Sequence, residues 1–233
     1  MPAALAPEID ALVFDVIGTL VDEDAVFSAT ANALAAAARL DDADALRHSW
    51  ARILDATMSD VVSGRAVWRP HSELVAAAGR AAVLEHGGAV TPQMNLALER
   101  VDGEYTAWPD VADGLRTLRS ERLVAGFSNG DLGWLARLAQ RNDLAWHAVL
   151  STSAVGTFKP AHSAYAYVID ALRLDVSRTL FVAAHPWDLH AAAGHGFRTA
   201  YVRRPGAELP GREDRFDFQV DSIADFAHLM RTP

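Results

Sequence analysis

The stretch that decides the fold spans residues 12–22 and reads LVFDVIGTLVD. Its first three residues form a short apolar run, which is typical of a parallel strand covered on both faces. Asp15 ends this run, at the carboxyl end of the predicted strand, where open α/β sheets place their ligands. Gly18 allows a tight turn, and Thr19 offers a hydroxyl beside it. The stretch therefore predicts a buried strand that presents one carboxylate, although an Asp at this position also fits a simple turn or helix cap.

The composition limits the classes of protein and partner. The chain has 233 residues, 51% of them hydrophobic, which suits one large domain or a core with an inserted subdomain. Its formal net charge of −9 argues against nucleic acid or an anionic membrane surface as the main partner. Because there is no cysteine, disulfides, thiolate nucleophiles and zinc–thiolate sites are excluded. We find neither a signal peptide nor a membrane span and expect a cytoplasmic protein.

Helical periodicity marks out an insert after the first strand. Between residues 22 and 105, apolar side chains recur every three or four positions, as in Phe27, Ala31 and Leu34, which predicts an all-helical segment broken by a few turns. Thr91, which precedes a proline, is the predicted N-cap of a helix within this insert.

After residue 105, predicted strands and helices alternate. Strands are predicted at 123–127, 148–151, 180–184, 199–202 and 218–220, with helices at 111–119, 132–140, 163–172 and 189–193. Strands separated by helices imply right-handed crossovers and a parallel sheet. The predicted fold class is therefore α/β, with a Rossmann-like parallel-sheet core of residues 1–21 and 106–233. The helical cap of residues 22–105 is expected over the edge where Asp15 emerges.

Three further stretches carry side chains that could work with Asp15, whose carboxylate can act as a covalent nucleophile and form an ester that water cleaves. Ser128 follows a predicted strand, and its hydroxyl could help to hold an anionic oxygen, although Ser-Asn-Gly also fits a plain turn. Lys159 could keep Asp15 ionised, although a lone lysine is usually a solvated surface group. The third stretch, residues 181–188, reads FVAAHPWD and begins within the predicted strand at 180–184.

The order and spacing of these stretches resemble the haloacid dehalogenase (HAD) superfamily over nearly the whole chain. The resemblance implies a Rossmann-like core with a helical cap and makes Asp15 the nucleophile. Most phosphatases of the superfamily carry two acidic residues in the last stretch, which bind Mg²⁺, whereas the matching positions here are Ala184 and Asp188. They also carry a general-acid Asp two residues after the nucleophile, where this chain has Ile17, which cannot transfer a proton.

Both departures make the chain similar to the metal-independent 2-haloacid dehalogenase branch, HAD type II. In that branch a Tyr lies six residues after the Lys of a Lys-Pro pair, as Tyr165 does after Lys159. The last motif ends in Trp-Asp, as Trp187 and Asp188 do here. The resemblance groups Thr19, Ser128 and Asn129 around the substrate carboxylate. It makes Lys159 and Tyr165 polar supports and lets Asp188 orient or activate the water that cleaves the ester. Ile17, Tyr165 and Trp187 are further candidates for contact with the substrate.

Two positions differ from the branch. It typically has Ser and Asn where this chain has Ala183 and His185, and a histidine there could support Asp188 or the water, or be merely structural. The branch also uses a cap arginine to receive the halide, and the best match falls at Ala51, next to Arg52. A one-residue shift turns a helical side chain by roughly 100°. Arg52 is our candidate for substrate binding, with two further cap candidates at Arg65 and Arg69.

The preferred hypothesis is a metal-independent hydrolytic dehalogenase of short 2-haloacids, which works through an ester on Asp15 and needs no cofactor. The expected partner is a small haloacid or a related anionic substrate, with neither nucleic acid nor a membrane involved; the resemblance also allows a homodimer. The second hypothesis is a Mg²⁺-dependent phosphatase of a small phosphate ester, which Ile17 and Ala184 oppose. The third is a HAD-fold protein that binds a ligand without turnover.

Overall fold

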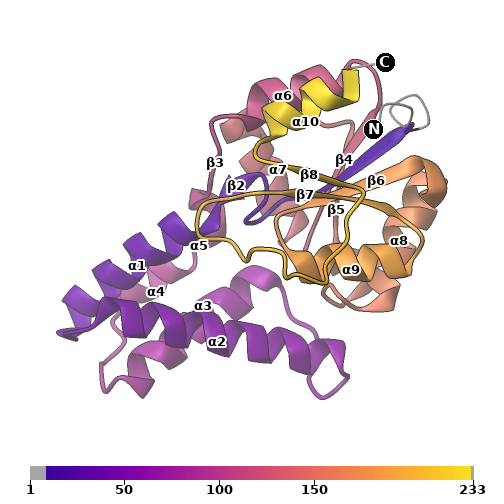
Figure 1. Ribbon diagram of the computed structural model, residues 1–233. Coiled ribbons are helices and arrows are strands. Elements are labelled where there is room, and N and C mark those ends of the chain that lie inside the picture. The colour runs from indigo at the N-terminus through magenta and orange to yellow at the C-terminus, as the bar shows by residue number, and fades with distance from the viewer. Residues whose placement is uncertain (1–8, 232–233) are drawn as a thin grey trace.

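A six-stranded parallel sheet forms the centre of the core (Figure 1), and the computed structural model describes residues 9–231. The strands lie in the order β5 (Ala148–Ser151), β4 (Leu123–Ser128), β1 (Ala11–Asp15), β6 (Thr179–Ala183), β7 (Arg198–Val202) and β8 (Phe218–Val220), and all neighbours are parallel. Because β1 pairs with β4 on one side and β6 on the other, Asp15 leaves the middle of the sheet. The predicted α/β fold is confirmed.

Alternating side chains of β1 reach the two faces of the sheet, as a strand with a period of two requires. Leu12 and Phe14 pack with side chains of α6 (Val111–Arg119), α7 (Leu132–Asn142) and α10 (Ile223–Arg231). Val13 packs with side chains of α8 (His162–Leu172) and α9 (Pro186–Gly194) on the opposite face. Both faces are therefore covered, which explains why residues 12–14 are uniformly apolar.

The segment between the first two strands of the core is helical, as the periodicity predicts. It contains α1 (Glu23–Ala38), α2 (Ala43–Val62), α3 (His71–Glu85), α4 (Pro92–Leu98) and the short α5 (Val101–Glu104). Phe27 and Trp50 pack with their rings tilted and the ring centroids 4.4 Å apart, and the Trp50 indole donates to the Val75 carbonyl at 2.8 Å. Thr91 caps α4, as predicted. Figure 1 shows these helices together below the sheet, and the division at residues 22–105 stays a prediction.

A two-stranded antiparallel ribbon joins this segment to the core: β2 (Val21–Asp22) pairs with β3 (Thr106–Ala107). Strands this short have no detectable periodicity, so they were absent from the prediction. A second connection comes from Asp131, whose carboxylate accepts hydrogen bonds from the backbone N–H groups of His71 and Ser72 at 2.9 and 3.1 Å. Since Asp131 directly follows the Ser-Asn-Gly turn, the cap is fixed to a loop of the candidate site.

Two helices differ from the expectation. Helix α9 begins at Pro186 rather than Leu189, because proline suits the first helical position, and this places Asp188 in the first helical turn. The C-terminal helix α10 was not predicted.

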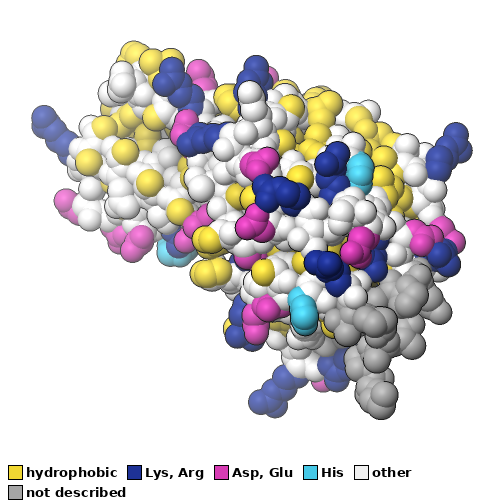
Figure 2. Space-filling view, turned by 90° about the horizontal axis from the view of Figure 1, so that it is seen from above, with side chains coloured by type: hydrophobic (Ala, Val, Ile, Leu, Met, Phe, Trp, Pro, Cys, Tyr) yellow, Lys and Arg dark blue, Asp and Glu magenta, His cyan; other side chains and the backbone are white. Residues whose placement is uncertain are grey.

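None of the helices among residues 9–231 is long and apolar enough to cross a membrane. On the face seen in Figure 2, basic and acidic side chains are interspersed, without the basic stripe that would favour nucleic acid.

Candidate active site

Asp15 lies at the carboxyl end of β1 and is only 4% exposed. Thr19 Oγ1 donates to Asp15 Oδ2 at 2.6 Å, and Lys159 Nζ donates to Oδ1 at 2.7 Å. The Thr19 hydroxyl also accepts a hydrogen bond from the backbone N–H of Ala184 at 2.9 Å. Each carboxylate oxygen therefore has a fixed donor, and Thr19 orients the carboxylate itself.

Lys159 connects Asp15 to Asp188 and is the only lysine in the sequence. Its Nζ lies 2.7 Å from Asp15 Oδ1 and 2.5 Å from Asp188 Oδ2, and the side chain is almost completely buried. The ammonium also lies 5.2 Å and 5.4 Å from the ring centroids of Phe127 and Phe181. Burial alone would lower the pKa of Lys159, but the two carboxylates outweigh it and raise the pKa above its ordinary value. The ammonium is therefore charged at neutral pH.

Asp188 is fully buried in the first turn of α9. Its Oδ1 accepts a hydrogen bond from the Tyr165 hydroxyl at 2.5 Å, while its Oδ2 faces Lys159. Burial raises the pKa of Asp188, Lys159 lowers it, and nearby Asp15 raises it again, so that the pKa ends above its usual range. Burial and the Asp188 charge also raise the pKa of Tyr165, which remains a hydrogen-bond donor. Asp188 thus holds Lys159 and Tyr165 in place.

The turn after β4 supplies Ser128 and Asn129. The Ser128 hydroxyl is buried and accepts a hydrogen bond from the backbone N–H of Gly130 at 3.1 Å. Asn129 Oδ1 accepts from the backbone N–H of Lys159 at 2.8 Å and from the Thr152 hydroxyl at 3.3 Å. This asparagine therefore fixes the loop that carries Lys159, a role that the motif alone does not indicate.

His185 lies against the nucleophile turn. Its Nε2 is 3.7 Å from Asp15 Oδ2 and 3.2 Å from the carbonyl oxygen of Ile17. Gly18 has a φ of +82°, and a Cβ there would lie 2.6 Å from His185 Nε2, so this position needs glycine for both its backbone and the close approach of the ring. Trp187 stacks beside the His185 ring with centroids 5.8 Å apart and is 41% exposed.

The predicted cap arginines do not reach this site. Arg52 is largely exposed and pairs with Glu85 of α3 at 2.7 Å. Arg65 and Arg69 pair with Asp60 and Glu73 on the cap surface. Because one residue turns a helical side chain by roughly 100°, Ala51 faces the site and Arg52 faces α3. The placement of Arg52 at the substrate is therefore corrected to a surface ion pair.

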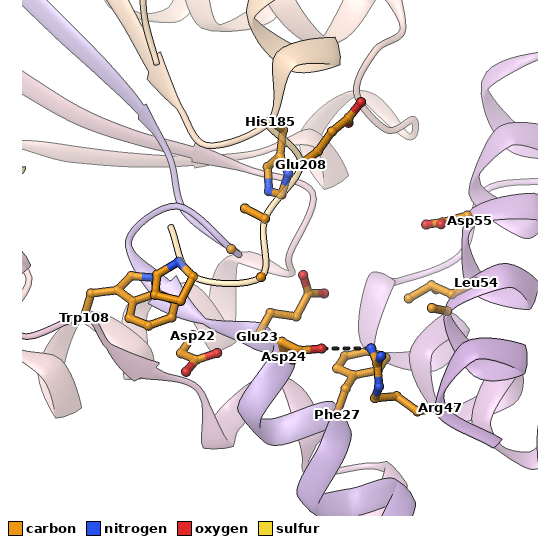
Figure 3. Close-up of a pocket in the computed structure, with 15 residues that line it drawn as sticks. Asp22, Glu23, Asp24, Phe27, Arg47, Leu54, Asp55, Trp108, His185 and Glu208 are labelled. Atoms are coloured by element: carbon orange, nitrogen blue, oxygen red, sulfur yellow. Dashed lines mark hydrogen bonds and ion pairs between the residues drawn. The ribbon is translucent and has the colours of Figure 1, made fainter. Parts of the chain in front are cut away.

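A cavity of about 280 Å³ opens between the core and the cap (Figure 3). Gly18 and His185 form its inner wall, which adjoins Asp15. The other lining residues come from α1, α2 and two core loops: Asp22, Glu23, Asp24, Phe27, Arg47, Ala51, Leu54, Asp55, Trp108 and residues 205–208. Ile17 and Trp187, both predicted to contact substrate, do not line this cavity, and Ile17 packs instead over Gly130.

Sequence reasoning missed Glu23, Arg47, Asp55 and Glu208 of this lining. Residues 47, 51 and 55 are four apart on α2, so helical spacing from the Ala51 position would have identified Arg47 and Asp55. Glu208 lies in the long loop between β7 and β8, and its position follows from no local pattern.

Among the residues that sequence reasoning missed, Glu23, the first residue of α1, has the pKa that departs most from its usual value. Burial raises its pKa to about 7, although the His185 and His71 charges act in the opposite direction. Partial desolvation also raises the pKa of Asp55, which is more exposed. Figure 3 shows both carboxylates directed into the cavity, from α1 and α2. The cap side of the site is thus acidic.

One position bears on metal binding. Ala184 is completely buried at the position where the resemblance to Mg²⁺-dependent phosphatases would place a carboxylate, and its backbone N–H donates to the Thr19 hydroxyl. Among residues 9–231, no three histidine, aspartate or glutamate side chains come together as a metal ion would require.

Residues 9–196 match the family of haloacid dehalogenase-like hydrolases. The (S)-2-haloacid dehalogenase 4A of Burkholderia cepacia is 28% identical and aligns over 94% of both chains. The (S)-2-haloacid dehalogenase of Xanthobacter autotrophicus is 30% identical over 88% of this chain and 79% of its own. Among solved structures, the defluorinating L-2-haloacid dehalogenase Rha0230 superimposes with a TM-score of 0.84 at 26% identity, covering 96% of this chain and 95% of the other.

The chain therefore belongs to the haloacid dehalogenase-like hydrolases. Within that family, its relatives place it in the type II branch, as the motifs around Asp15, Lys159 and Asp188 predict.

Proposed function

We propose that this protein hydrolyses the carbon–halogen bond of short (S)-2-haloacids without a metal ion. The observation that carries the proposal is the Asp15 carboxylate at the end of β1, held by Thr19 and Lys159 beside a cavity. The named activity of the relatives supports the reaction class and the enantiomer.

In the first step, an Asp15 carboxylate oxygen attacks the carbon that bears the halogen. The new C–O bond forms as the C–X bond breaks, and halide leaves with the bonding electron pair, so the configuration inverts. Because the leaving group is halide, no proton donor is needed two residues after the nucleophile, which fits Ile17. The Lys159 ammonium holds the Asp15 carboxylate in position before attack, and Ser128 and the neighbouring backbone N–H groups are proposed to hold the substrate carboxylate.

In the second step, water attacks the carboxyl carbon of the Asp15 ester and releases a 2-hydroxy acid. Both oxygens of Asp188 are already bonded to Tyr165 and Lys159, so we assign Asp188 to positioning Lys159. His185 is a part-exposed imidazole beside Asp15. Because its Nε2 faces the Ile17 carbonyl oxygen and therefore carries the hydrogen, Nδ1 is the proposed acceptor of the water proton. One solvent oxygen therefore enters Asp15 and leaves in the next turnover.

The first test is halide release from fluoro-, chloro- and bromoacetate and from both enantiomers of 2-chloro- and 2-bromopropionate, all in EDTA. We expect release by the wild type, preference for the (S) enantiomers, and none by Asp15→Asn. In H₂¹⁸O, a single turnover should leave the label in Asp15. Halide release that persists in Asp15→Asn, with no deamidation back to Asp, would contradict the mechanism. No release by the wild type from any compound, together with Mg²⁺-dependent hydrolysis of phosphate esters, would favour a phosphatase.

A further inference from the structure

Gly18 leaves a small space that two ionisable side chains share. A Cβ at this position would lie 2.6 Å from His185 Nε2 and 3.7 Å from Glu23 Oε2. The imidazole reaches this point from the core, and the carboxylate reaches it from the first turn of α1. Figure 3 shows the Glu23 side chain rising from α1 into the cavity that His185 also lines. The two side chains therefore lie within electrostatic reach of each other.

His185 faces several carboxylates, which differ in how strongly water screens them. Asp15 Oδ2 lies 3.7 Å from its Nε2. Asp55 of α2 and Glu208 of the loop after β7 line the same cavity, but both are exposed, so water screens their charges. Glu23 is partly buried, and its charge is screened less. Asp15 and Glu23 are therefore the carboxylates expected to act most strongly on the imidazole.

Formation of the ester would change this balance. In the resting enzyme the Asp15 carboxylate faces His185, whereas an ester on Asp15 carries no charge. The imidazole would then have to accept the water proton without its nearest counter-charge. Burial is the main cause of the raised pKa of Glu23, and the Asp15 charge adds to it. Loss of that charge would therefore favour the ionised form of Glu23 at the stage when His185 needs an anion.

We propose that Glu23 is the counter-charge of His185 in the second step, where its carboxylate stabilises the imidazolium that forms when Nδ1 accepts a proton from the attacking water. It rests on the proposed function for the ester on Asp15. In that step a water O–H bond breaks, the oxygen bonds to the ester carbonyl carbon, and the proton moves to Nδ1. Glu23 exchanges neither a bond nor a proton, so it is a positioning residue that acts through His185.

The kinetic test separates the two steps in single-turnover experiments with (S)-2-bromopropionate. Rapid quenching follows bromide release, and mass spectrometry of the protein follows the ester on Asp15. In Glu23→Gln we expect bromide release within about twofold of wild type and ester hydrolysis slower by about tenfold, so that the ester accumulates. Equal slowing of both steps would overturn the inference, because a general distortion of the site would explain it.

Two further variants assign the effect. Asp44→Asn removes the same charge in the first turn of another cap helix, at an exposed position outside the cavity, and should leave both steps unchanged. In His185→Gln, which lacks the imidazole, adding Glu23→Gln should slow ester hydrolysis by less than about twofold. A further tenfold loss in that background would show that Glu23 does not act through His185.

A titration without turnover separates this inference from the proposed function. Asp15→Asn removes the Asp15 charge as an ester would, and NMR can follow the His185 ring, whose resonance is identified by its loss in the double variant with His185→Gln. Adding Glu23→Gln to Asp15→Asn should move the titration midpoint of this ring to lower pH by about half a unit or more, because the cation loses its counter-charge. Adding Asp55→Asn instead should move it less.

The outcomes of the titration are independent of halide release. No shift with Glu23→Gln, or an equal shift with Asp55→Asn, would overturn the role of Glu23 even where halide is released. A shift specific to Glu23→Gln, together with no halide release by the wild type, would support the pairing of Glu23 with His185 and reject the proposed function.

Discussion

On the core side of the candidate site, Lys159 forms close ion pairs with Asp15 and Asp188, whereas on the cap side Glu23 and Asp55 line a cavity that they share with His185. The core group is buried, and breaking such a pair is costly because it leaves an uncompensated charge. The cap carboxylates border a cavity, where water and a ligand can solvate them. We therefore expect the core side to carry the proposed reaction and the cap side to contact the rest of the substrate.

The largest effect is expected from Asp15→Asn, which removes the nucleophile from the core side. An amide does not attack carbon as a carboxylate does, so kcat for halide release should fall by about 10⁴-fold or more. The control is Asp10→Asn, an exposed position just before the same strand, which should keep nearly full activity. Comparable losses in both variants would mean that Asp15 has no special role.

Lys159→Met tests whether the buried charges depend on their common partner. We expect the free energy of unfolding to fall by about 3 kcal/mol, because two carboxylates would remain close together without a cation. Urea denaturation measures this loss, and adding Asp188→Asn should restore part of it. Arg65→Met, which removes an exposed ion pair of the cap, should cost less than about 0.5 kcal/mol. If Lys159→Met and Arg65→Met lost the same free energy of unfolding, the buried core charges would be no more dependent on their partner than an exposed cap ion pair.

The cap has one buried ion pair of its own, between His71 and Asp102, whose atoms approach to 2.8 Å. Burial alone would lower the pKa of His71, but Asp102 raises it to about 8. Because the folded pKa exceeds the unfolded value of about 6.5, the stabilisation is complete below pH 6.5 and is lost as pH rises through 8. Wild type should lose about 2 kcal/mol of stability between pH 6 and pH 9 relative to His71→Gln. Parallel pH profiles of the two proteins would rule out this assignment.

The smallest effect is expected from Arg52→Gln, because Arg52 pairs with Glu85 outside the cavity. Halide release should change by less than about twofold, and stability by less than about 0.5 kcal/mol. A large increase in KM for haloacids would instead show that Arg52 moves to the substrate and that the cap side supplies a cation.

Local patterns were sufficient for the fold and for the position of Asp15. The apolar run at residues 12–14, the alternation after residue 105 and the helical spacing of the cap each follow from burial of one repeating face. Asp15 was placed at the carboxyl edge of the sheet because its apolar run ends there. The resemblance to the haloacid dehalogenase superfamily, rather than a local pattern, grouped Lys159, Asp188 and Tyr165 with it.

The cap side could not be derived in the same way. Whether Ala51 or Arg52 faces the cavity depends on the rotation of α2, which the packing of Trp50 on Phe27 and α3 determines. Glu23 directly follows β2, a strand too short to predict, and Glu208 enters through a long loop. The positions of these cap-side residues depend on tertiary packing rather than on the spacing of apolar residues along the sequence.

The single lysine gives this protein a built-in spectroscopic reporter. Lysine labelled with ¹⁵N at Nζ would place one labelled side chain in the whole chain, at the ammonium between Asp15 and Asp188. Its resonance would follow the charge of those two carboxylates without assignment by mutagenesis. Formation of an ester on Asp15 would remove one negative charge 2.7 Å from that nitrogen, so each stage of turnover could be observed at one signal.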